Sequence, residues 1–223
     1  IKYLKALGVK NIKIAGNLKY FNQSKKVLDK STRNFFKDRL IFCAASTHQN
    51  EELFIGKVHK ELKLKYNNLL TIVIPRHINR SSSIANELEH IDLKIITRSS
   101  KAKISKTTDV YIADTYGETS KFYKMSNIAF LGGSLIPHGG QNPLEPARLG
   151  NYILHGPNIQ NFKEVYNMLS KLNVSSKVNS ISIMKKIVSK KIKYKQPLKT
   201  SQKLNYIGND ILKKNLYEIN KYI

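Results

Sequence analysis

Two glycine pairs, a proline and one glutamate fall within a single stretch of 16 residues. The stretch covers residues 132–147 and reads GGSLIPHGGQNPLEPA. Glycine lets backbone amides approach a ligand closely, and a helix that begins near Asn142 presents unpaired amides at the same place. Asn142 suits the cap of that helix and Pro143 its first position. The stretch therefore predicts a loop that binds an anion such as a phosphate.

Two shorter motifs carry further side chains with suitable chemistry. Pro75 and Arg76 directly follow an apolar run, where a guanidinium can pair with a phosphate through two parallel hydrogen bonds. The alternative is an ordinary surface arginine in a basic protein. Tyr116, Gly117 and Glu118 follow another apolar run. These three residues either contact a ligand or serve structural roles. The structural roles are a simple turn and, for Glu118, a position in the first turn of a helix.

Three more polar residues have both a structural and a functional interpretation. Glu145 lies three residues after Asn142, so it either reaches back to the cap amide or faces a ligand. Ser46 and His48 suggest a nucleophile and a base, but such a pair needs a third group that orients the histidine. We favour cap and ligand-pocket roles for them. The histidines and acids show no metal-ligand spacing, so we predict no bound metal.

The motifs follow short apolar runs that alternate with helical segments. Such alternation predicts an α/β fold, which is a Rossmann-like parallel sheet with helices on both faces. In such folds, ligands gather beyond the carboxyl ends of the strands. The expected strands are 12–15, 40–45, 69–74, 94–97, 110–113, 128–131 and 152–155. The expected helices are 51–66, 84–91, 119–125, 144–149 and 162–172, and a last helix at about 203–222 follows a lysine-rich linker at 190–199.

The composition is strongly basic. The 223 residues carry a formal net charge of +24 and suit one large domain or a domain with an appendage. Such a charge attracts nucleic acid or anionic lipid, whereas a lysine-rich surface set by codon usage is the plain alternative. No apolar run approaches the length of a membrane span, so we expect a soluble piece. Cys43 lies in an apolar run and is expected to be a buried thiol.

In this order and at this spacing, the motifs resemble those of the 3-deoxy-D-manno-octulosonic acid (Kdo) transferases, which glycosylate the lipid A precursor of Gram-negative bacteria. The likeness extends from about Gly16 to about Leu169 and includes AASTH at 44–48, GPN at 156–158 and NF at 161–162. It covers only the second of the family's two halves. The resemblance implies the C-terminal domain of a GT-B type glycosyltransferase. We expect a donor-binding Rossmann-like domain at 1–195, a lysine-rich helical segment at 196–223, and no N-terminal acceptor domain in this chain.

The resemblance also implies a donor, CMP-Kdo, and a set of residues that bind it. No cofactor besides this donor substrate is expected. Glu145 would bind the ribose hydroxyls, with Gly139 and Gly140 leaving room for the nucleotide. The residues implied in CMP binding are Pro75, Arg76, Tyr116, Gly117, Glu118, Asn142, Pro143, Leu144 and Glu145, and those of a possible donor pocket are Ser46, His48, Gly139 and Gly140.

The family's general base, acceptor site and membrane attachment belong to the other half. We therefore expect a chain that binds the donor but does not transfer sugar alone. Its expected partners are CMP-Kdo, the lipid A precursor through the missing half, and an anionic surface at the cytoplasmic face of the inner membrane, but no nucleic acid. The alternatives are a non-catalytic CMP-binding remnant and a basic protein that binds polyanions or nucleic acid.

Overall fold

A computed structural model describes residues 2–15 and 36–221. The described residues divide into two compact units, 36–201 and the combination of 2–15 with 202–221. Residues 16–35, which include the start of the region that resembles the transferases, lie outside the described residues. All of the candidate site residues belong to the larger unit.

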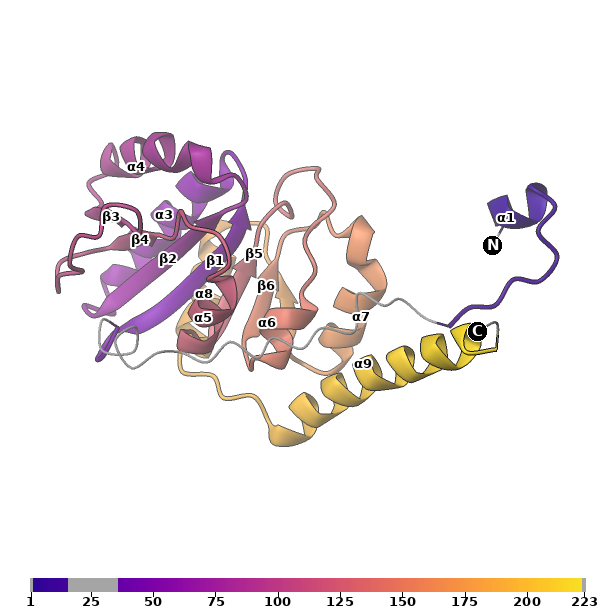
Figure 1. Cartoon of the computed structure of the whole chain (residues 1–223). Helices are drawn as coiled ribbons and strands as arrows, with labels where there is room; N and C mark the ends of the chain where they lie inside the picture. Colours follow the sequence, from indigo (N-terminus) through magenta and orange to yellow (C-terminus); the bar gives the residue numbers. More distant parts are fainter. Residues whose placement is uncertain (1, 16–35, 222–223) are drawn as a thin grey trace. The chain divides into compact units, whose positions relative to one another are not determined.

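Within the described residues, a seven-stranded parallel sheet forms the centre of the larger unit (Figure 1). Its spatial order is β3-β4-β2-β1-β5-β6-β7. Almost every residue of the central strands β1 and β2 is buried, because helices cover both faces of a parallel sheet. The strands are β1 (Leu40–Thr47), β2 (Leu69–Pro75), β3 (Ile95–Thr97), β4 (Val110–Ile112), β5 (Ile128–Leu131), β6 (Tyr152–His155) and β7 (Ser175–Lys177).

Helices cover both faces of this sheet (Figure 1). On one face α3 (Glu51–Lys63), α4 (Ser81–Glu89) and α8 (Ile181–Lys191) pack on Phe42, Phe130 and Leu154. On the other face lie α5 (Thr119–Met125), α6 (Leu144–Arg148) and α7 (Lys163–Lys171), where Phe122 contacts the ring of Tyr111. The remaining helical segments are α1 (Lys2–Ala6), η2 (Ile78–Arg80), η3 (Gln160–Phe162) and α9 (Leu198–Ile219). The predicted fold class is confirmed.

The two faces have separate apolar cores. Phe42, Phe130 and Ile55 are completely buried in the core beneath α3, and each such side chain contributes about 1.5 to 3 kcal/mol by leaving water. Cys43 points to the opposite face from Phe42 and is also completely buried. Burial raises the pKa of its thiol. The prediction of a buried thiol is confirmed.

Several predicted elements differ from the observed ones. The strand expected at 12–15 is wrong: the segment has no regular structure, and Ile14 is 75% exposed. Strand β7 and helix α8 were missed, β7 because Ser175-Ser176-Lys177 lacks an apolar pattern. Helix α9 begins five residues before the expected start, directly after Pro197, and this shortens the predicted linker. Among the described helices, none is long and apolar enough to cross a membrane.

Candidate functional site

The candidate residues lie on four connections at one edge of the sheet. Ser46 lies near the end of β1 and His48 directly follows it, while Pro75 is the last residue of β2 and Arg76 follows it. Residues 116–118 follow β4, and 139–145 follow β5. These strands are neighbours in the order β4-β2-β1-β5, and all are parallel. Their carboxyl ends therefore meet at the same edge, where ligands bind in open α/β sheets. The structure brings the predicted motifs together as the strand pattern indicated.

The ends of β1 and β5 approach each other more closely than regular strands do. An added Cβ on Gly132 would lie only 2.2 Å from the carbonyl oxygen of Ser46 and 2.6 Å from Cα of Thr47. Ser46 itself has a φ of 54°, and the pairing of β1 with β2 shifts register between Ala45 and Thr47. A left-handed conformation at a residue other than glycine is strained and is concentrated at functional sites. Gly132 is thus required for the close contact rather than for a ligand.

The glycine-rich loop already holds an anion, which is the side chain of Glu51 at the start of α3. Oε2 of Glu51 accepts hydrogen bonds from the amides of His48 (3.0 Å) and Gly133 (2.7 Å). Oε1 accepts from the amides of Ser134 (3.1 Å) and Leu135 (2.9 Å). The carboxylate is 1% exposed. In this part of the predicted anion-binding loop, an internal carboxylate rather than a ligand occupies the amides. Phosphate binding by the rest of residues 132–147 stays a prediction.

Glu51 is the principal residue that sequence analysis missed. Burial raises the pKa of Glu51, and the amide hydrogen bonds of the loop oppose that rise by stabilising the carboxylate. The contacts join residues more than 80 positions apart, so no local spacing reveals them. The only signals in the sequence were an acid in the first turn of an amphipathic helix and a Gly-Gly-Ser motif after a distant strand.

The second glycine pair packs against the chain itself. An added Cβ on Gly139 would lie 2.2 Å from Nδ2 of Asn161, and one on Gly140 would lie 3.1 Å from the carbonyl oxygen of Asn158. Both glycines have positive φ values, 101° and 76°. The expected open space beside them is filled by the segment after β6. Gly139 and Gly140 therefore shape the loop, and a role for them in the donor pocket stays a prediction.

The two arginines after β2 have different environments. Arg80 pairs with Glu52, whose side chain is completely buried, at 2.9 Å. The side chain of Arg76 is exposed, while its amide donates to the carbonyl oxygen of Thr47 at 2.9 Å. That hydrogen bond holds the backbone of Arg76 at the ends of β1 and β2. It leaves the guanidinium able to adopt different rotamers. Arg76 is therefore suited to a ligand, whereas Arg80 anchors α3 to this edge.

Three histidines from three connections lie together next to Arg76. The ring centroid of His48 is 4.3 Å from that of His138 and 6.1 Å from that of His77. His48 is 8% exposed, and its Nε2 is buried without a hydrogen-bond partner among the described residues. Burial, followed by the charges of His138, His77, Arg76 and Arg80, lowers the pKa of His48 to about 4. His48 is thus neutral at pH 7. We call His48, His77 and His138 the imidazole cluster.

The Tyr-Gly-Glu motif forms the turn before α5. Gly117 has a φ of 80°, which favours glycine, and Tyr116 is 78% exposed. Glu118 pairs with Arg98 (3.0 Å) and accepts a hydrogen bond from Thr115 (2.6 Å), with Lys121 also at 3.2 Å. Hydrogen bonding to Arg98 is the largest cause that lowers the pKa of Glu118 to about 2. Its carboxylate is already engaged within the fold, so the motif presents mainly backbone and the tyrosine ring.

Helix α6 begins one residue later than expected: Pro143 is its cap residue and Leu144 its first residue, whereas Asn142 and Pro143 were expected at these positions. Oδ1 of Asn142, one residue before the cap, still accepts a hydrogen bond from the amide of Leu144 at 3.1 Å. Pro143 and Leu144 are buried, and Glu145 is partly exposed and accepts a hydrogen bond from the hydroxyl of Ser120. The helix is only five residues long, so it can offer an anion an amide rather than a long-range dipole. The amide of Leu144 donates to Asn142, that of Ala147 donates to Pro143, and Pro146 has no N–H, which leaves the amide of Glu145 in the first turn.

A buried network that resembles a catalytic triad lies near the other ends of the strands. Nδ1 of His59 is 2.8 Å from the hydroxyl of Thr71, and its Nε2 is 3.4 Å from Oδ1 of Asp109. Lys63 also pairs with Asp109. His59 and Thr71 are completely buried, so no substrate can reach the hydroxyl. The network stabilises the fold. Within the described part of the chain, no cluster of three or more His, Cys, Asp or Glu side chains could hold a metal ion.

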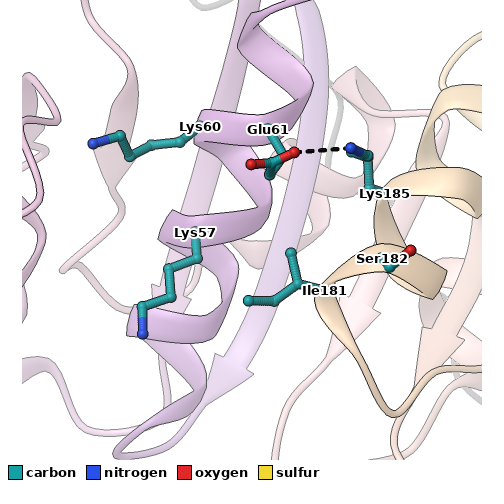
Figure 2. A pocket seen from close by; sticks show the side chains of 6 residues that line it. All are labelled: Lys57, Lys60, Glu61, Ile181, Ser182 and Lys185. Atoms are coloured by element: carbon teal, nitrogen blue, oxygen red, sulfur yellow. Dashed lines mark hydrogen bonds and ion pairs between the residues drawn. The ribbon is translucent and has the colours of Figure 1, made fainter.

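A basic pocket between α3 and α8 lies outside the candidate site (Figure 2). Lys185 pairs there with Glu61 at 2.8 Å, as the dashed line shows, and Lys60 pairs with Asp92 at 3.3 Å. These ion pairs reduce the positive charge that the pocket offers to a polyanion. None of the candidate residues lines it. Its lining residues are Lys57, Lys60, Glu61, Ile181, Ser182 and Lys185.

Comparisons with known proteins give consistent matches. No protein-family model matches the chain. The 3-deoxy-D-manno-octulosonic acid transferase of Haemophilus influenzae is 36% identical over 209 residues, which cover 92% of this chain and 48% of that protein. The protein of the same name from Rickettsia bellii is 33% identical over 156 residues, which cover 69% of this chain and 37% of that protein. The chain thus spans half the length of these relatives or less.

Among solved structures, the C-terminal CMP-Kdo binding domain of WaaA from Acinetobacter baumannii is similar to this chain. The TM-score is 0.69 and the sequence identity is 28%. The match covers 81% of this chain and 93% of that domain. It therefore includes nearly all of a domain that has been solved on its own.

Proposed function

Because the chain belongs to the Kdo transferase family, whose C-terminal domain it matches, we propose that its α/β domain binds the cytidine nucleotide of CMP-Kdo. The family and the half that were assigned from the motifs are both confirmed. The observation that carries the proposal is the exposed guanidinium of Arg76 beside the imidazole cluster, at the carboxyl ends of the central strands. This is the edge at which open α/β sheets bind nucleotides.

In the proposed complex, Arg76 pairs with the phosphate of the donor. The amides of Gly133, Ser134 and Leu135 are bound to Glu51, so the phosphate relies on the guanidinium and on the amide of Glu145 in the first turn of α6. Pro75 is buried and holds the start of the β2 connection in place. The chain needs no metal for this phosphate, since a single phosphate carries less charge than a diphosphate.

The ribose and the base complete the proposed nucleotide site. Glu145 binds the ribose hydroxyls, and its present hydrogen bond from Ser120 holds the carboxylate in position on α6. Asn142, Pro143 and Leu144 shape the pocket through the start of that helix. The remaining contacts come from the turn before α5, through the backbone of Gly117 and Glu118 and the exposed ring of Tyr116. Ser46 and His48 border the sugar end of the donor.

The proposed reaction of the whole enzyme transfers Kdo to a hydroxyl of the lipid A precursor, with inversion at the anomeric carbon and release of CMP. Arg76 and the amide of Glu145 stabilise the leaving phosphate, which is electrostatic catalysis by preorganised donors. The acceptor must lose a proton to a general base, which we assign to the N-terminal half of the enzyme together with the acceptor site. The chain alone then binds the donor without transferring sugar.

We also propose that the enzyme works at the cytoplasmic face of the inner membrane. The basic charge supports this, because each lysine near an anionic lipid surface contributes about 1 kcal/mol of attraction. The same charge favours the competing proposal of a general polyanion binder. That competitor predicts binding that falls steeply with salt and does not depend on Arg76 or Glu145. A remnant that binds CMP but has lost transfer is a third possibility, which only a transfer assay with the N-terminal half distinguishes.

The experiment is a calorimetric titration with CMP at about 0.15 M salt, which screens nonspecific attraction. Arg76→Ala should weaken binding about 10- to 100-fold, because a charge-assisted hydrogen-bond pair contributes about 1.5 to 3 kcal/mol. Glu145→Ala should weaken it about tenfold. Lys57→Ala is the matched control, since it removes one positive charge from the pocket in Figure 2. Equal losses in all three variants would refute a specific nucleotide site.

A further inference from the structure

The surroundings of the imidazole cluster carry more positive than negative charge. Among the described residues, no acidic side chain beside the cluster is available to it. From α3, Glu51 is bound to four amides and Glu52 to Arg80. From α6, the carboxylate of Glu145 is bound to Ser120. These acids are therefore committed elsewhere. The other charged or titratable groups that face His48 are His77, Arg76 and Arg80 from the β2 connection and His138 from the β5 connection.

One atom of the cluster has an unmet bonding requirement. Nε2 of His48 is buried but has no hydrogen-bond partner among the described residues, although buried polar atoms are nearly always paired. The same ring lies 4.3 Å from the ring of His138, which is exposed. An unpaired buried atom costs about 1 to 3 kcal/mol, so such an atom calls for an explanation, and a bound ion beside the exposed part of the cluster is one. Nε2 of His48 faces Gly133, because a Cβ added to Gly133 would lie 3.3 Å from this nitrogen.

We propose that the imidazole cluster is a second anion subsite of the donor pocket, and that an anionic group bound there takes up a proton onto one of its imidazoles. The inference rests on the proposed function. The ligand chemistry is an oxygen anion of the donor, from either its phosphate or the carboxylate of its sugar acid. Arg76 supplies a permanent charge, whereas the histidines supply a charge that appears when the ligand binds.

The bound anion favours the protonated form of the imidazole, and the imidazole takes that proton from solvent. Without a ligand, burial and then the charges of His138, His77, Arg76 and Arg80 disfavour the charged form of His48. An anion among the rings reverses this effect, because an opposite charge within about 4 to 6 Å favours the charged form. Binding and protonation are therefore coupled, and each must strengthen the other. Affinity for the donor should rise as pH falls from 7.5 to 6.0.

Calorimetric titration of the full chain tests this, with CMP-Kdo and with the methyl ester of CMP at pH 6.0 and 7.5. Both ligands are phosphate diesters, so their anionic groups do not titrate in this interval and any proton uptake belongs to the protein. Repeating each titration in two buffers of different ionisation enthalpy measures the protons taken up. An imidazole that starts from the ordinary pKa of about 6.5 and gains about one unit on binding tightens binding about fourfold between these pH values. Uptake with both ligands assigns the phosphate, and uptake with CMP-Kdo alone assigns the carboxylate.

His77→Gln and His138→Gln change exposed side chains, so neither variant depends on a repacked core. At least one of them should abolish the proton uptake and the pH dependence. His90→Gln is the matched control, because His90 is an exposed histidine at the end of α4. Saturable binding that is independent of pH but still lost in Arg76→Ala would overturn the imidazole subsite and leave the proposed function intact. Absence of saturable binding at either pH would overturn both.

Discussion

Replacing Glu51 with glutamine should destabilise the larger unit more than any other single change of charge on α3. The carboxylate accepts four amide hydrogen bonds, two on each oxygen. In Glu51→Gln an NH2 group replaces one oxygen, so two of the four bonds are lost and two amides then face a donor. A hydrogen bond to a charged group contributes about 1.5 to 3 kcal/mol. The loss of two predicts a cost of about 3 to 6 kcal/mol.

This cost is a large fraction of the stability of an ordinary domain, which is about 5 to 15 kcal/mol. For a chain of this size, it corresponds to a fall in Tm of roughly 10 °C. The assay is urea denaturation followed by circular dichroism at pH 7, with thermal unfolding as a second measurement. Glu51→Asp keeps the charge but shortens the side chain. Its free energy of unfolding should lie between that of the unmodified protein and that of Glu51→Gln.

Glu61→Gln provides the matched control on the same helix. Glu61 is exposed and has one ion pair, with Lys185 at 2.8 Å, so its replacement should cost less than 1 kcal/mol. The reasoning would be refuted if Glu51→Gln and Glu61→Gln lowered the free energy of unfolding equally. That result would mean that the loop amides gain as much from water as from the buried carboxylate.

Two further predictions concern carboxylates away from the glycine-rich loop. Asp109→Asn should lower the free energy of unfolding by about 2 to 3 kcal/mol in urea denaturation, because it removes the carboxylate that pairs with Lys63 and His59. Burial opposes ionisation of Asp109, but its hydrogen bonds outweigh burial and lower its pKa. A cost below about 0.5 kcal/mol would contradict this account. Glu118→Gln should cost about 1 kcal/mol at pH 7. Since the folded protein lowers the pKa of Glu118 from 4.5 to about 2, this contribution is complete above about pH 4.5 and disappears as pH falls toward 2. Denaturation at pH 6 and pH 3 checks the sign, and a difference that grows on acidification would contradict it.

The sequence alone determined the fold class and the edge of the sheet that carries the motifs. Apolar runs at β1, β2, β5 and β6 are continuous because both faces of each strand are buried, so they can be read without knowledge of neighbours. The start of α6 was readable to within one residue, because the hydrogen bond between Asn142 and Leu144 is a local interaction. The segment at 12–15 has the same apolar character but no regular structure, which shows that a strand also needs a neighbouring strand to pair with. Strand β7 shows the converse, since pairing with β6 forms it from polar residues.

Only the tertiary structure decided how the loops at that edge are occupied. Nothing near Gly133 in the sequence indicates that a carboxylate from α3 binds its amide, and nothing near Gly139 indicates that Asn161 fills the adjacent space. The imidazole cluster likewise combines residues from three separate connections. Local patterns reveal how a backbone folds because secondary structure depends on nearby residues. The partners of a loop are set by the order of strands in the sheet, which brings distant residues to one edge.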